Sequence, residues 1–64
     1  MKADQEEHNH KGFAITLTRH DSRWIATFKD PLNGKYKALE EDSKDGLLRL
    51  AQKSIEVSIS ISRL

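Results

Sequence analysis

The chain has 64 residues, a net charge of +1 and no cysteine. A chain of this length forms one domain at most and buries only about 60% of the surface its unfolded form exposes, so a deep enclosed pocket is not expected. The lack of cysteine excludes disulfides and thiolate metal sites. The amino terminus is too polar for a signal peptide, and no apolar run approaches the roughly 18 residues of a membrane span, so we expect a soluble cytoplasmic protein.

Residues 1 to 11 have no apolar periodicity, which predicts a flexible polar arm. Residues 12 to 64 then form a single domain. His8 and His10 lie in the arm, but two histidines without further ligands do not make a stable zinc site. We therefore expect no metal and no cofactor.

Two strands are predicted at the start of the domain, because residues 13 to 19 and residues 23 to 29 each alternate apolar with polar side chains. Residues 20 to 22 have turn chemistry, so the two strands should form a hairpin. Trp24 is in phase with the apolar side of its strand. We expect it to pack in the core, with exposure for base stacking as the alternative.

A second turn is predicted at residues 30 to 34, which read DPLNG, because proline presets a turn and Asn-Gly tolerates positive φ. Residues 35 to 39 then form a third strand or an extended loop. The pattern leaves open which way the side chains of this segment face.

A helix is predicted next, because Asp42 and Ser43 are good N-cap residues and Asp45 complements the positive end of the helix dipole. Its apolar stripe consists of Leu47, Leu48, Leu50 and Ala51.

In residues 55 to 62 the spacing of the apolar residues changes to every second position. The β-branched residues Ile55, Val57, Ile59 and Ile61 alternate with polar ones, which predicts a final strand from about Ile55 to Ser62. An exposed strand of this kind must join the sheet or pair with another chain, so these four residues are the candidates for self-association or partner capture. The predicted fold is therefore α+β, a small antiparallel sheet of three or four strands in the order β-β-β-α-β, with one helix packed on one face.

Charge is segregated along the chain. Residues 11 to 39 hold six basic residues against two acidic ones, whereas residues 40 to 46 hold four acidic residues against one lysine. The candidate nucleic-acid-binding residues lie in the basic segment, on or next to the polar side of the predicted sheet: Arg23, Thr27, Lys29, Lys35 and Lys37. A solvent-exposed sheet face without a binding role has the same composition, and this interpretation stays open.

No catalytic residues are predicted. His20, Asp21 and Ser22 are neighbours in a tight turn, where their side chains point apart and do not form a nucleophile, base and orienting acid. The acidic residues 40 to 42 precede a helix, which makes capping their expected role. The three isolated glycines do not form a phosphate-binding loop.

Residues 23 to 51 resemble the DNA-binding domain of plant ethylene-response factors and the related arm-binding domains at the amino termini of phage integrases. The resemblance is carried by Trp24, Ile25, Ala26, Phe28, Lys29, Asp30, Pro31, Asn33, Gly34, Leu39 and the helix cap. It implies a three-stranded sheet backed by one helix, with Thr27 and Lys29 where that family contacts DNA. The chain differs in lacking an arginine-rich first strand and in having Ala38 where an aromatic residue is usual.

Residues 24 to 51, together with the predicted final strand, also resemble HicB-like antitoxin domains, in which a hairpin, a turn containing proline or glycine and a capped helix occur in the same order. This resemblance implies binding to a partner protein.

Taken together, the sequence predicts a small non-enzymatic binding or regulatory module of phage or bacterial type. DNA or RNA is the preferred partner, and a protein partner or a homodimer is the alternative.

Overall fold

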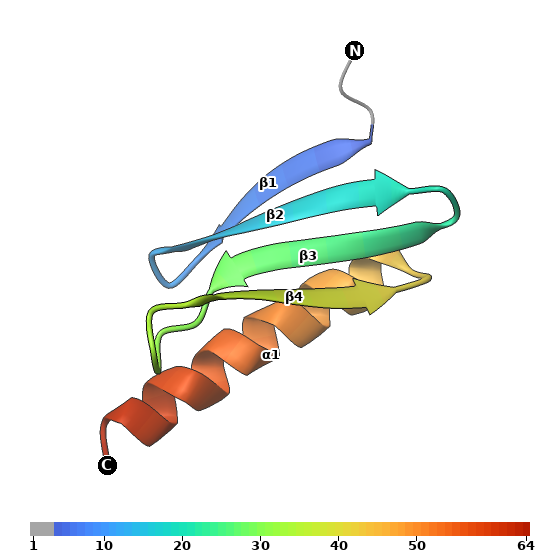
Figure 1. Cartoon of the computed structure of the whole chain (residues 1–64). Coiled ribbons are helices and arrows are strands. Elements are labelled where there is room, and N and C mark those ends of the chain that lie inside the picture. Colours follow the sequence, from blue (N-terminus) through green and yellow to red (C-terminus); the bar gives the residue numbers. More distant parts are fainter. Residues whose placement is uncertain (1–3) are drawn as a thin grey trace.

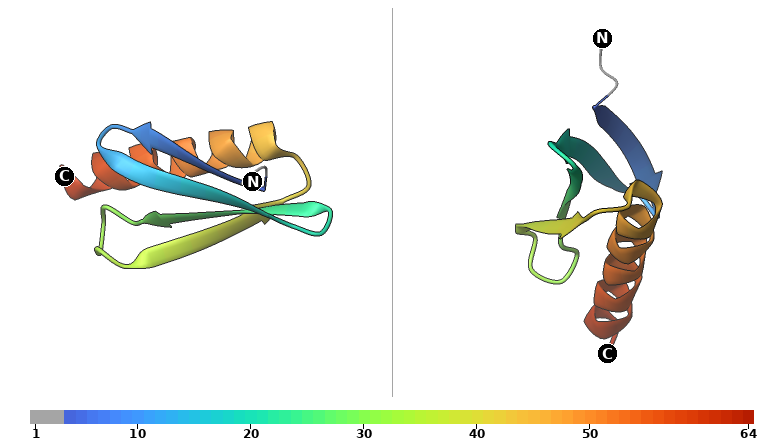
Figure 2. Two further views of the ribbon diagram at one scale, coloured as in Figure 1. Left: turned by 90° about the horizontal axis from the view of Figure 1, so that it is seen from above. Right: turned by 90° about the vertical axis from the view of Figure 1, so that its right-hand side faces the viewer.

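Four strands followed by one helix make up the chain in the computed structural model, which describes residues 4 to 64 (Figure 1). Each strand pairs antiparallel with the next one in sequence, so the sheet has the order β1-β2-β3-β4. The helix lies on one face of this sheet (Figure 2). The predicted α+β class, with an antiparallel sheet and a single helix, is confirmed. The elements are β1 (Gln5–His10), β2 (Phe13–His20), β3 (Arg23–Lys29), β4 (Tyr36–Glu41) and α1 (Lys44–Ser62).

The expected flexible arm is wrong for residues 5 to 10, because these residues form the edge strand β1. This strand pairs with β2 from Gln5 opposite Thr18 to His10 opposite Phe13. Its helix-facing side chains are polar, so the strand gives no apolar alternation in the sequence. Backbone pairing with β2, the ion pair of Glu6 with Lys44 and the hydrogen bond between His10 and Glu56 hold it instead. The first three residues of the expected arm lie outside the described residues.

The expected final strand is also wrong, because residues 55 to 62 continue helix α1 to Ser62. Residues four apart share a face in a helix and in a strand, so alternating apolar residues also supply helical pairs. Ile55 and Ile59 turn toward the core, whereas Val57 and Ile61 are 48% and 47% exposed. The β-branched residues cost the helix only tenths of a kcal/mol each, roughly, which core packing outweighs.

The core lies between the sheet and α1. Four fully buried side chains come from the sheet and three from the helix: Ile15, Leu17, Ala26, Phe28, Leu47, Ala51 and Ile55. Trp24 is partly buried and packs against this cluster, as its phase in the strand predicts. The helix-side spacing of four, from Leu47 to Ala51 to Ile55, matches one helical face.

Local hydrogen bonds fix both the turn and the helix start. The Ser43 hydroxyl accepts from the backbone N–H of Gly46 at 3.2 Å, which confirms the predicted cap. In the turn between β3 and β4, the buried Asp30 carboxylate accepts from the N–H of Leu32 at 2.9 Å. Gly34 has φ 73°, a conformation that an L side chain rarely adopts.

Candidate nucleic-acid interface

The face of the sheet that α1 leaves uncovered is called the outer face. Since Ile15 and Phe28 point into the core, their neighbours Thr16 and Thr27 point to the outer face, where they lie directly opposite each other. Ala38 continues this row on β4. The outer face consists of Gln5, Glu7, Asn9, Ala14, Thr16, Thr18, His20, Arg23, Ile25, Thr27, Lys29, Tyr36, Ala38 and Glu40.

Tyr36 is the most exposed aromatic side chain of the described residues, at 77% exposure. It lies opposite Lys29 in the pairing of β3 with β4. A shallow hollow beside this pair is lined by Tyr36, Lys29, Thr27, Thr16, Ala14, Phe13, Gly12 and Glu7. The outer face therefore carries Tyr36, Lys29, Thr16 and Thr27 around one hollow.

The structure brings only part of the predicted nucleic-acid-binding set together. Thr27 and Lys29 lie at this hollow, and Lys35 directly precedes Tyr36 in the chain. Arg23 and Lys37 do not join them.

Arg23 lies at the other end of β3, where two carboxylates hold it. Its Nε donates to Glu40 at 2.6 Å and its Nη1 to Asp42 at 2.9 Å. The hydrogen bond to Glu40, followed by the charges of Glu40 and Asp42, raises the pKa of Arg23 above its ordinary value. A phosphate would have to compete with these carboxylates for the guanidinium group.

Lys37 faces the helix side of the sheet because it alternates with Tyr36 and Ala38. Its Nζ lies 3.4 Å from Asp30 Oδ2. The hydrogen bond from the N–H of Leu32 is the main cause that lowers the pKa of Asp30, and Lys37 contributes. Lys37 is thus part of the turn structure rather than of the outer face.

Tyr36 was not among the predicted site residues. Two lysines flank it in the sequence, and the alternating pattern leaves the facing of residues 35 to 39 open. The signal that identifies it is Leu39: a single leucine in this strand must face the core, which turns Tyr36 to the opposite side.

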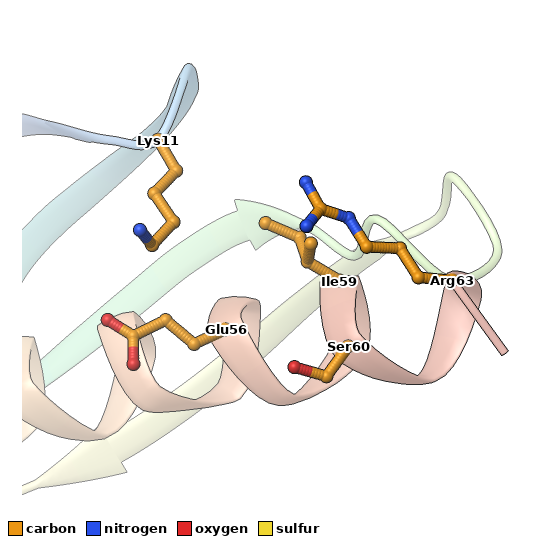
Figure 3. A pocket seen from close by; sticks show the side chains of 5 residues that line it. All are labelled: Lys11, Glu56, Ile59, Ser60 and Arg63. Atoms are coloured by element: carbon orange, nitrogen blue, oxygen red, sulfur yellow. The ribbon is translucent and has the colours of Figure 1, made fainter.

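A second hollow lies between the β1–β2 turn and the end of α1, lined by Lys11, Glu56, Ile59, Ser60 and Arg63 (Figure 3). Glu56 is already bound there, because His10 Nε2 lies 2.7 Å from its Oε2. Lys11 and Arg63 supply two cations from separate elements.

Within residues 4 to 64 no group of three or more histidine or acidic side chains lies close enough to hold a metal ion. No helix in this part of the chain is long and apolar enough to cross a membrane.

Comparison of the chain with protein-family models, curated proteins and solved structures found no match. The two family resemblances of the sequence therefore stay predictions, and the function rests on the geometry alone.

Proposed function

We propose that this domain binds single-stranded DNA or RNA through the outer face of its sheet, without catalysing a reaction. The observation that carries the proposal is the exposed ring of Tyr36, which lines one hollow with Lys29, its partner in the pairing of β3 with β4. A tyrosine at 77% exposure contributes nothing to the core, so its ring is available to a ligand.

Each part of the hollow has a role in this proposal. A base stacks on the ring of Tyr36, an interaction that contributes about 1 to 3 kcal/mol per base and tolerates any sequence. Lys29 and Lys35 neutralise phosphates on either side of that base. The hydroxyls of Thr16 and Thr27 donate to phosphate or sugar oxygens, which positions the strand.

Single strands fit this surface better than a duplex. Stacking on Tyr36 requires a base with a free face, and bases inside a duplex are stacked on each other.

The test is fluorescence anisotropy of a labelled oligothymidylate with the wild-type chain and single variants over a series of salt concentrations. Tyr36→Ala should weaken binding by about five- to a hundredfold at every salt concentration, because stacking is lost. Tyr36→Phe keeps the ring and should bind like the wild type. Lys29→Ala should make the salt dependence shallower by about 0.7 in slope.

Lys53→Ala is the matched control, because it removes the same charge from an exposed position of α1. Arg23→Ala and Lys37→Ala should change affinity less than Lys29→Ala, since both are engaged in ion pairs. Equal affinity of the wild type and Tyr36→Ala, or no binding by the wild type at low salt, would refute the proposal.

One observation favours the alternative, a protein-interaction module. Leu50, Val57 and Ile61 are each about half exposed on α1, although the strand expected to carry Val57 and Ile61 does not form. Exposed apolar side chains grouped on one helix flank are typical of protein contact surfaces.

A further inference from the structure

The outer edge of β4 is open. The sheet ends at β4, and among the described residues no other strand pairs with its free side (Figures 1 and 2). Such an edge presents unpaired backbone N–H and C=O groups, which are a template for pairing with another strand. The opposite edge, β1, differs because the ion pair of Glu6 with Lys44 and the hydrogen bond between His10 and Glu56 tie it to α1.

The charge pattern of β4 is complementary to itself. Lys37 lies near its start, with Lys35 directly before the strand, and Glu40 and Glu41 lie at its end, with Asp42 directly after it. An antiparallel copy of the strand runs in the opposite direction, so it places its acidic end beside the basic end of the first. Cross-strand pairs of opposite charge stabilise a sheet, and like charges destabilise it.

One register satisfies both the charges and the faces of the sheet. Residues directly opposite each other in an antiparallel pair point to the same face, and Lys37, Leu39 and Glu41 all point to the helix side. A two-fold axis at Leu39 puts Lys37 opposite Glu41 of the second copy, twice, and the two Leu39 side chains together. Lys37 keeps its contact with Asp30 at 3.4 Å, and its side chain is 43% exposed, so Glu41 of the second copy can reach it as well. Glu41 forms no ion pair within residues 4 to 64, so its carboxylate is free for this contact.

The helix supplies a second contact on the same side. Glu56 and Ile59 mark the flank of α1 that faces β1 and its turn, since Glu56 pairs with His10. Leu50, Val57 and Ile61 lie on the other flank by helical periodicity, at exposures of 46%, 48% and 47%. This apolar flank is therefore on the β4 side of the molecule.

We propose that two copies of this chain form a two-fold symmetric dimer by antiparallel pairing of β4 with β4, which joins the two sheets into one of eight strands. The apolar flanks of the two α1 helices are covered in the same interface. The outer faces of both copies then lie on one side of the joined sheet, with one Tyr36 and one Lys29 from each. The dimer does not depend on nucleic-acid binding, and it differs from the self-association strand predicted at residues 55 to 62.

The test is a charge exchange read by sedimentation equilibrium without nucleic acid. Lys37→Glu places four carboxylates at the two cross-strand pairs, and Glu41→Lys places four ammonium groups there. Each variant alone should dimerise about tenfold more weakly than the wild type. An equimolar mixture of the two variants restores both pairs and should dimerise like the wild type, as should the double variant K37E/E41K.

Recovery in the mixture separates the interface from folding, because a variant that failed to fold would not be restored by its partner. Val57→Asp should weaken the dimer with unchanged helical circular dichroism, since the side chain is half exposed. A wild-type chain that is monomeric at several hundred micromolar, or single variants that dimerise as well as the wild type, would overturn the proposal.

Discussion

Lys44 Nζ lies 2.5 Å from Glu6 Oε2, so the first residue of α1 is joined to the edge strand β1. The same ammonium group lies 5.5 Å from the centre of the Trp24 ring, within the range of a cation–π interaction. The pair lowers the pKa of Glu6 and raises that of Lys44, mainly through their mutual hydrogen bond. Since the helix-facing side chains of β1 are polar, this contact is a principal tie between the strand and the helix.

Glu6→Gln should loosen β1 without unfolding the domain, because the core draws no side chain from that strand. The measurement is hydrogen exchange at the amides of residues 5 to 10, which should speed up relative to the wild type. Glu7→Gln is the control. It makes the same change one residue away on the outer face, and exchange should stay as in the wild type. Equal rates in both variants would contradict the role given to the Glu6–Lys44 pair.

Stability should fall at both extremes of pH. The pKa values of Glu6 and Asp30 are lowered on folding, so their contribution is complete above their ordinary values of 4.5 and 3.8 and is lost as the pH falls through the lowered ones. The pKa of Lys44 is raised, so its contribution is complete below 10.5 and is lost as the pH rises through the raised value.

The pH dependence is measured as the urea midpoint over a pH series. The acid limb is the fall of the urea midpoint toward low pH. Asp30→Asn should make this limb shallower, because the buried carboxylate that accepts from the N–H of Leu32 is removed. Asp21→Asn changes an exposed turn residue and should leave the acid limb unchanged. An acid limb in Asp30→Asn that is as steep as in the wild type would exclude this carboxylate as its cause.

Ile55→Ala and Ile61→Ala should differ sharply, since Ile55 is fully buried and Ile61 is 47% exposed. The first leaves a cavity in the core and should cost about 2 to 5 kcal/mol of unfolding free energy. The second should change it by about 0.5 kcal/mol or less. Urea unfolding by circular dichroism, at a concentration where the chain is monomeric, provides both values. A final strand would place both side chains on one face, so equal losses would contradict the helix.

Gly46→Ala should stabilise the domain by about 0.5 to 1 kcal/mol, because alanine is the better helix former. A Cβ at this position would meet Ser43 Oγ at 3.6 Å, an ordinary van der Waals contact. Gly34→Ala should have the opposite effect and cost about 1 to 2 kcal/mol, since its φ of 73° strains any L side chain. Thermal unfolding of the two variants measures both changes, and a loss of stability in Gly46→Ala would show that the helix start is not as described.

Much of the fold is predictable from local pattern. The alternation around Ile15 and Phe28, the turn at Asp30 and Gly34, and the cap at Ser43 each depend on neighbours in the chain, and the structure confirms them. These features form because short-range sterics and hydrogen bonding decide them.

The parts that were mispredicted depend on distant contacts. Strand β1 has polar side chains toward the helix, and Lys44 and Glu56, which are distant in sequence, supply the partners of Glu6 and His10 there. The end of α1 has a pattern that fits a strand as well as a helix, and packing of Ile55 against the sheet decides between them. Of the candidate site, Lys29 and Thr27 could be found from their strand, but Tyr36 required knowledge of which side of β4 faces the core.

The sheet order β1-β2-β3-β4 also has a consequence for how the chain reaches its native state. Every strand pairs with its neighbour in sequence, so each hairpin closes only a short loop. The contacts between residues far apart in sequence form when α1 packs on the sheet. Proteins dominated by such local pairings cross their folding barrier quickly for a β-containing topology. We therefore expect a single fast refolding phase, in which the three hairpins form first and α1 then packs against the sheet.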